Sequence, residues 1–177
     1  MANHKLLAPF ILQAEGGYVN DPLDAGGETN KGITYSVWKT VFGDDHPRFI
    51  AMLDEDWKTV FKKLYWDAIL GDQITSQRIA DIICDWVWGS GKYYPETDIQ
   101  DILIHVFSEQ ITEDGNFGQH TIDAINEVDE FQLYNTILQK RMWYLNQIVI
   151  AHPTNQRFLQ GWKNRMTNLV AFDKVNS

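Results

Sequence analysis

The amino-acid sequence predicts a mainly α-helical protein with one small β-hairpin. Apolar residues recur at the three- and four-residue spacing of amphipathic helices over most of the 177-residue chain. Residues 18–34 break this pattern and are rich in Gly, Pro, Asn and Asp, and strand-like alternation is minimal elsewhere. The chain is 44% hydrophobic, which is typical of a globular protein with a core rather than of a disordered one.

The first predicted helix begins after Asn3, a residue type that caps helix N-termini. It carries an apolar face formed by Leu6, Leu7, Phe10, Ile11 and Ala14. We expect Gly16 and Gly17 to end it, because glycine adopts the left-handed C-terminal conformation at little cost. Glu15 should therefore lie in the last helical turn.

Residues 18–34 predict a short β-hairpin or an ordered loop. Pro22 and three glycines, with Asn and Asp residues among them, are typical of turns.

Helices should dominate the rest of the chain. Ser36 is the expected cap of a short helix through Phe42, and Asp54 that of a helix carrying Trp57, Val60, Phe61 and Leu64. A mostly buried helix over 76–88 should stop at Gly89-Ser90-Gly91. Further helices are expected at about 97–108, 119–127, 130–150 and 154–171. The polar segment 92–98, which contains Pro95, suggests a boundary between a domain at 1–91 and a helical one at 92–177.

Charge and cysteine content narrow the class of protein. The formal net charge is −9, from 15 basic and 24 acidic residues, which argues against a nucleic-acid binder. The single cysteine, Cys84, excludes an intramolecular disulfide and reads as a small buried hydrophobe. The five histidines show no zinc-like pairing, so we expect no metal site and no cofactor. No segment is apolar enough for a membrane span, and the oligomeric state is not predicted.

Glu15 and Asp24 are the candidate catalytic pair. A carboxyl at a helix C-terminus faces the negative end of the helix dipole, which favours its protonated form and suits a general acid. Asp24, in a turn rich in backbone donors, should stay ionised. Each residue has a plain structural reading as well, Glu15 as a solvated helix end and Asp24 as a turn former. The combination of both acids with the Gly-rich hairpin and Thr-x-x-Gly-Ile-Thr favours the catalytic reading.

These residues resemble a known signature. The runs are Glu15-Gly-Gly-Tyr18, Asp21-Pro-x-Asp24-x-Gly-Gly-x-Thr29 and Gly32-Ile-Thr34, and together they are similar to glycoside hydrolase family 108. That family comprises lysozyme-like N-acetylmuramidases related to phage endolysins, some of them labelled secretion activators. The resemblance implies a lysozyme-like fold and hydrolysis of the β-1,4 bond between N-acetylmuramic acid and N-acetylglucosamine in peptidoglycan. It assigns the catalytic role to Glu15, and analogy with phage muramidases adds Asp24 and Thr29.

The resemblance extends beyond this motif. The helix at 79–91 is similar to the one that closes the family's catalytic region, although Gly89 stands where many relatives have Asn. Residues 113–126 resemble the Asp-Gly-x-Phe-Gly-x-x-Thr turn of helical peptidoglycan-binding modules, and a purely structural role for that turn is equally open. We expect substrate contacts from Tyr18, Thr34, Asp85 and Trp88, with a surface or capping role as the alternative for Asp85. At most one of Trp86 and Trp88 should face the groove, and most tryptophans should be core residues.

The expected partner is therefore the peptidoglycan glycan strand. An acidic protein gains no steering toward an anionic wall, so binding should come from a shaped groove. Residues 1–13 show no recognisable signal peptide. We therefore expect synthesis in the cytoplasm and action in the periplasm or cell wall after release by another route.

Two alternatives remain open at this stage. A lytic transglycosylase would use Glu15 alone and release a 1,6-anhydro product. A non-catalytic wall-binding or secretion-associated protein would keep the fold without the activity. The retaining or inverting outcome depends on the separation of the two carboxyls in space.

Overall fold

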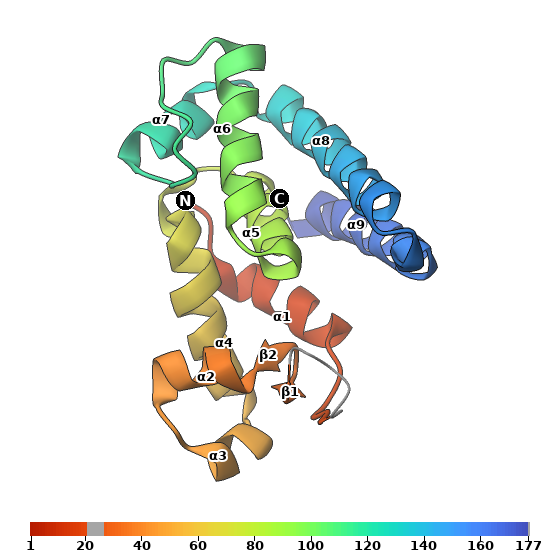
Figure 1. The fold of residues 1–177 in the computed structure, drawn as a ribbon. Helices are drawn as coiled ribbons and strands as arrows, with labels where there is room; N and C mark the ends of the chain where they lie inside the picture. Colours follow the sequence, from red (N-terminus) through yellow and green to blue (C-terminus); the bar gives the residue numbers. More distant parts are fainter. Residues whose placement is uncertain (21–26, 177) are drawn as a thin grey trace.

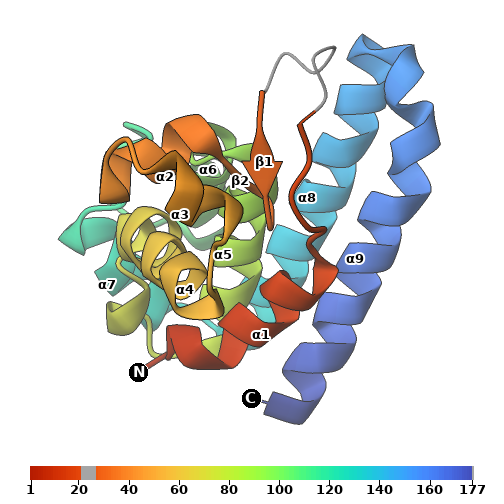
Figure 2. The same ribbon diagram turned by 90° about the horizontal axis from the view of Figure 1, so that it is seen from below.

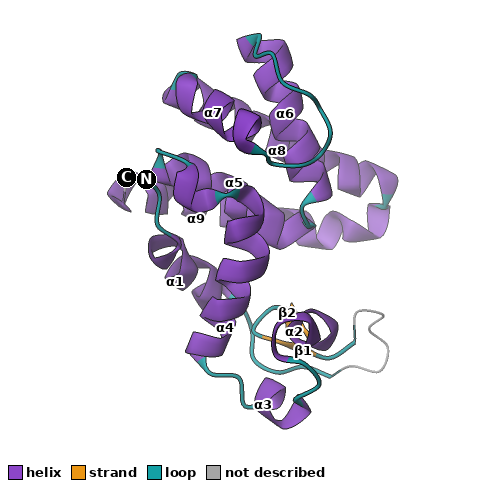
Figure 3. Ribbon diagram, turned by 90° about the vertical axis from the view of Figure 1, so that its left-hand side faces the viewer, coloured by secondary structure: helices purple, strands orange, loops and turns teal. Residues whose placement is uncertain are grey.

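The fold is mainly helical, as the sequence predicts. The computed structural model describes residues 1–20 and 27–176, and in these ranges the chain forms nine α-helices and one two-stranded hairpin (Figures 1 and 3). The hairpin pairs β1 (Thr29–Asn30) with β2 (Ile33–Thr34) in antiparallel register. The helices are α1 (His4–Ala14), α2 (Tyr35–Phe42), α3 (His46–Ile50), α4 (Asp54–Phe61), α5 (Gln77–Ser90), α6 (Tyr93–Phe107), α7 (Gln119–Glu127), α8 (Glu130–Ala151) and α9 (Gln156–Asn176). None of the described helices is both long and apolar enough to cross a bilayer.

Helix α5 is the centre of the molecule. It contacts α1, α6, α8 and α9, and nine of its residues are buried. In Figure 2, α8 and α9 run side by side along one edge, and α1 packs against α9. The core is a single cluster that extends from Ala2 to Leu169 and includes four fully buried tryptophans, Trp38, Trp57, Trp66 and Trp86. The buried Cys84 belongs to it, as expected.

The hairpin turn needs a glycine for a clear reason. Lys31 and Gly32 both have positive φ, of 47° and 76°, as in the two-residue turns that match the twist of paired strands. Glycine tolerates this conformation, and the neighbouring lysine takes it at some cost. The turn places the Gly32 backbone beside the end of α1.

Several helix boundaries differ from the sequence prediction. Gly16 and Gly17 do not adopt the left-handed conformation, and α1 instead ends with Glu15 in an extended conformation. The cap of α2 is Thr34 rather than Ser36, because the Thr34 hydroxyl accepts from the Val37 amide. Asp54 is the first residue of α4, and Leu53 stands at the cap position. The Leu53 amide donates to the Asp56 side chain. Residues 62–66 continue α4 as a π-helical turn.

The segment 92–98, where the sequence suggests a domain boundary, forms the cap and the first part of α6. Pro95 is the third residue of α6. Backbone N–H groups in the first turn of a helix have no intrahelical acceptor, so a proline, which lacks this group, is tolerated there. Only Gly91, with φ of 72°, separates α5 from Lys92, the cap of α6. The two predicted domains therefore meet at a single-residue break, and helices from both halves pack on α5.

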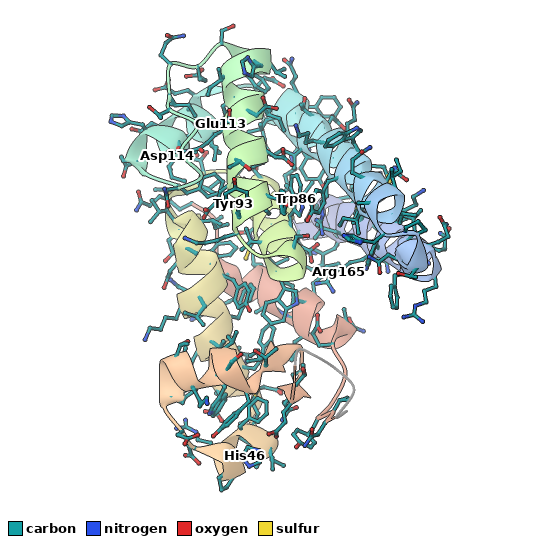
Figure 4. The ribbon with its side chains drawn as sticks, viewed as in Figure 1. His46, Trp86, Tyr93, Glu113, Asp114 and Arg165 are labelled. Atoms are coloured by element: carbon teal, nitrogen blue, oxygen red, sulfur yellow. The ribbon has the colours of Figure 1, made fainter. Side chains whose placement is uncertain are left out.

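The turn before α7 serves the fold. Gln100 of α6 accepts from the Gly115 amide at 2.8 Å and donates to Asp114 and Thr121. Phe117 and Thr121 are buried, so two motif side chains point inward. These contacts support the structural reading of this segment, which Figure 4 shows around Asp114.

Two buried carboxyls where α5 meets α9 make stability depend on pH. Burial and the nearby Asp173 raise the pKa of Asp81 to about 8. The unfolded carboxyl ionises above about pH 4, whereas the folded one keeps its proton, so the free energy of unfolding decreases as pH rises from about 4 to 8. We expect Asp81→Asn, which accepts the same hydrogen bond from Gln77, to stabilise the protein by at least about 1 kcal/mol at pH 8 and little at pH 4.

Urea denaturation of both proteins at the two pH values checks this expectation. A stability difference that stays constant with pH would show that Asp81 ionises normally in the folded protein.

Candidate active site

Glu15 lies at the C-terminus of α1, where the chain leaves the helix. Its amide donates to the Leu12 carbonyl at 3.2 Å, and its extended backbone turns the chain toward the hairpin. The side chain is largely covered, with 18% of its surface exposed. The carboxyl therefore stands at the edge of the core but remains open to a ligand.

Trp88 of α5 holds one oxygen of this carboxyl. Its indole Nε1 donates to Glu15 Oε1 at 2.8 Å. The Trp88 ring packs against Tyr65 at 4.6 Å and Trp57 at 5.4 Å between ring centroids, which gives the site an apolar wall. Burial, with a contribution from the Glu15 charge, raises the pKa of Tyr65, so its hydroxyl keeps its proton.

Arg165 of α9 reaches the same oxygen from the other half of the chain. Its Nη1 donates to Glu15 Oε1 at 3.4 Å, and its Nε donates to Asp85 Oδ1 at 2.9 Å. Asp85 is fully buried and also accepts from Arg141 Nη2 of α8 at 2.6 Å. Burial alone would raise the pKa of Asp85, but the two guanidiniums outweigh it and hold the pKa below its usual value.

Gly32 lies against the second carboxyl oxygen. A Cβ built on Gly32 would be 2.4 Å from Glu15 Oε2 and 2.9 Å from the Trp88 ring, so only glycine fits. Both donors, Trp88 and Arg165, use Oε1 as an acceptor. A proton on the carboxyl is therefore carried by Oε2, on the side that faces the hairpin.

Replacing Gly32 should damage the site directly. Gly32→Ala would force Glu15 away from Trp88 and place an alanine at φ of 76°, which costs roughly 1–2 kcal/mol. We expect turnover to fall by at least about 10-fold, as in other cases where a reacting group is displaced. The check is a rate assay combined with thermal unfolding.

Gly43→Ala is a matched control, because Gly43 also has φ of 76° but no atom lies near its missing Cβ. Equal losses of activity in the two variants would contradict this role for Gly32.

These groups open into one cavity of about 340 Å³. Its lining comes from α1, the hairpin turn, α5, α8 and α9, namely Glu15, Gly32, Trp88, Gly89, Ser90, Arg141, Leu145, Ile148, Trp162 and Arg165. A larger cavity of about 650 Å³ lies between α1 and α4, but its one carboxylate, Glu55, is paired with Lys58. The smaller cavity, which we call the catalytic cleft, has a carboxyl held between an indole and a guanidinium and is the better candidate.

The structure brings some of the predicted site residues together. Glu15 and Trp88 meet in the catalytic cleft, whereas Trp86 is fully buried. Asp85 has no exposed surface to offer a glycan, so the predicted substrate contact and the surface role both fail, and the carboxylate instead anchors Arg165 and Arg141. Asp24 lies outside the described residues.

The other three predicted residues lie on the hairpin side. Tyr18 is 38% exposed and donates to Glu28, which also bonds His46 at 2.6 Å. Thr29 pairs with Thr34 across the hairpin, and the Thr34 hydroxyl caps α2. Among the described residues that line the cleft, none of these three appears, so their substrate roles stay predictions.

Three residues around the Glu15 and Asp85 carboxylates were not predicted. Gly32 belongs to the recognised motif, and its place before Ile33-Thr34 was the available signal. Arg141 and Arg165 lie on helices whose existence was expected but whose orientation was not. No local pattern links Arg165 to Glu15, which is 150 positions away.

One surface group has side chains that suit a cation. Asp101, His105 and Glu113 bring ligand atoms within 4.8 Å of one another. The spacing of the histidines does not indicate this group, because two of its members are carboxylates. Asp101 already pairs with Lys140 at 3.0 Å, and the group is largely exposed, so we assign no metal there.

Comparison with known proteins identifies both parts of the chain. Residues 8–91 match the family model described as Glycosyl hydrolase 108, and residues 94–167 match that of a Predicted Peptidoglycan domain. The fold is similar to the structure of Brucella abortus SagA, with a TM-score of 0.77 and 22% identity over 98% of this chain and 96% of that one. No curated protein matches the sequence. The chain thus consists of a lysozyme-like glycosyl hydrolase 108 domain followed by a predicted peptidoglycan domain.

Proposed function

We propose that this protein hydrolyses the β-1,4 bond between N-acetylmuramic acid and N-acetylglucosamine in peptidoglycan, with Glu15 as the general acid. The observation that carries the proposal is the geometry of Glu15. Two donors hold Oε1, and Oε2 remains to carry a proton at the edge of the catalytic cleft. A glycosidic oxygen is a poor leaving group until it is protonated, so a carboxyl fixed in this way suits the reaction.

The cleft also suits a sugar. Trp88 and Trp162 give it aromatic surface, Leu145 and Ile148 give it apolar surface, and Arg141 and Arg165 give it positive charge. A pocket with mostly apolar walls and a few converging polar groups is typical of small-ligand sites. The match of residues 94–167 to a predicted peptidoglycan domain supports peptidoglycan as the polymer.

The second carboxylate of the proposed reaction is Asp24. Its position in the sequence motif supports this role, in which it stabilises positive charge at the sugar carbon or activates a water. Glu15 is the only carboxylate among the described residues that line the cleft, and the alternative of a lytic transglycosylase would need this one acid alone. The two reactions give different products.

Digestion of purified sacculi with mass spectrometry of the fragments distinguishes these functions. We expect fragments with a reducing N-acetylmuramic acid end, because water is added across the cleaved bond. Fragments lighter by one water, with a 1,6-anhydro end, would identify a transglycosylase. Intact strands would favour the non-catalytic wall-binding role. Since the proposed substrate is outside the cytoplasm, we place the action of the protein in the periplasm or cell wall.

A further inference from the structure

Three tyrosines form a continuous series at the start of α6 and on the neighbouring face of α8. The ring of Tyr144 lies 5.3 Å from that of Tyr94, and the ring of Tyr94 lies 5.4 Å from that of Tyr93. We call Tyr93, Tyr94 and Tyr144 the tyrosine platform. Tyr93 is labelled in Figure 4, at the end of α6 that lies beside α5.

The two outer rings of the platform are exposed and are not part of the core. Tyr93 is 68% exposed and Tyr94 is 52% exposed, whereas Tyr144 is partly covered and packs on the buried Trp86. Contiguous exposed apolar surface on a soluble protein commonly marks a binding site. Tyr144 holds the series in place, so the two outer rings are presented on a rigid base.

The platform is continuous with the catalytic cleft. Ser90 lines the cleft, and its side chain lies near that of Tyr144. Only Gly91 and Lys92 separate Ser90 from Tyr93 along the chain. A linear polymer that leaves the cleft past Ser90 therefore comes close to the tyrosine platform.

We propose that the tyrosine platform binds sugar rings of the glycan strand that lie beyond the cleaved bond, and so makes the enzyme favour long strands over short fragments. This inference rests on the proposed function for the identity of the polymer. The faces of β-1,4-linked sugar rings present C–H groups, which suit the electron-rich face of an aromatic ring, and the hydroxyls of both partners can exchange hydrogen bonds. A polymer with repeating rings matches a platform of repeating rings.

The test compares long glycan strands with the shortest fragment that spans the scissile bond. We expect the double variant Tyr93→Ala/Tyr94→Ala to lose about 10-fold in kcat/KM on long strands, through KM, as expected for two lost aromatic contacts. On the short fragment kcat/KM should not change. Replacing both residues by Phe keeps the rings and should retain most of the activity on long strands.

A matched control separates the platform from exposed aromatics in general. Phe131 of α8 is 67% exposed and lines a different cavity. Phe131→Ala should therefore leave kcat/KM unchanged on both the long strands and the short fragment. Thermal unfolding of each variant reports whether the fold is intact. A loss of equal size on long and short substrates, or no loss in the double variant, would overturn the inference.

Binding without turnover distinguishes this inference from the proposed function. In a Glu15→Gln background, purified sacculi should retain the protein in a pelleting assay, and the two tyrosine changes should weaken that binding about 10-fold. Retention without any hydrolysis by the unchanged protein would refute the proposed function alone. If the unchanged protein hydrolyses sacculi, but the two tyrosine changes do not weaken binding to them, the inference about the platform alone is refuted. Tyr93 and Tyr94 would then serve another partner.

Discussion

Glu15→Gln is expected to reduce turnover of peptidoglycan by at least about 10²-fold, the lower end of the range for general acid catalysis. Glutamine keeps the shape of the side chain and an oxygen that accepts from Trp88 and Arg165. It removes the acidic proton that Oε2 would carry. The measurement is the initial rate on purified sacculi at several pH values.

The variant should fold as the unchanged protein does, because the replaced carboxyl lies at the edge of the core. Thermal unfolding and pelleting with sacculi provide the controls for fold and for binding. A Glu15→Gln protein with nearly full activity would remove Glu15 from the mechanism.

The sequence predicts the helices well because their signals are local. Asn3 acts as a cap as expected, and the helices α5, α7 and α8 begin and end within two or three residues of the predicted limits. Amphipathic spacing depends only on residues that are close in sequence, so it can be recognised without knowledge of the fold. The errors lie at boundaries where two residues compete for one role, as Thr34 and Ser36 do at the start of α2.

Glycines were harder to interpret, because the same residue type serves unrelated purposes. Gly16 and Gly17 suggested a left-handed helix end, yet neither adopts it and a Cβ on either would meet nothing. Gly32 is needed on both counts, for its positive φ and for its contact with Glu15. The sequence shows a glycine but not the atom that approaches it, and here that atom belongs to a helix 17 positions away.

The half of the site that could not be predicted comes from long-range packing. Asp85 was expected at the surface or against the substrate, because an Asp in a helix is usually solvated. Its burial depends on Arg141 and Arg165, which α8 and α9 bring to the C-terminal part of α5. Such a cluster arises only when three helices pack together, and no spacing within one segment reveals it.

Replacing Arg165 should impair catalysis more than replacing Arg141, although both guanidiniums pair with Asp85. Only Arg165 also reaches Glu15, at 3.4 Å. Arg165→Met and Arg141→Met each leave the buried Asp85 with one partner, so each should destabilise the protein by up to about 3 kcal/mol. Arg165→Met should in addition lower kcat by about 10- to 10²-fold, because Glu15 loses a group that orients its carboxyl.

The pair of variants serves as its own control for this prediction. Urea denaturation gives the two stabilities, and kcat at saturating substrate, measured well below the unfolding temperature of both proteins, gives the catalytic effect. Arg165→Lys keeps the charge but not the planar fork that contacts Asp85 and Glu15 together, so it should recover stability better than kcat. If both methionine variants lost kcat to the same extent, Arg165 would act only by holding α9 against α5, and the orientation of Glu15 would depend on Trp88 and Gly32 alone.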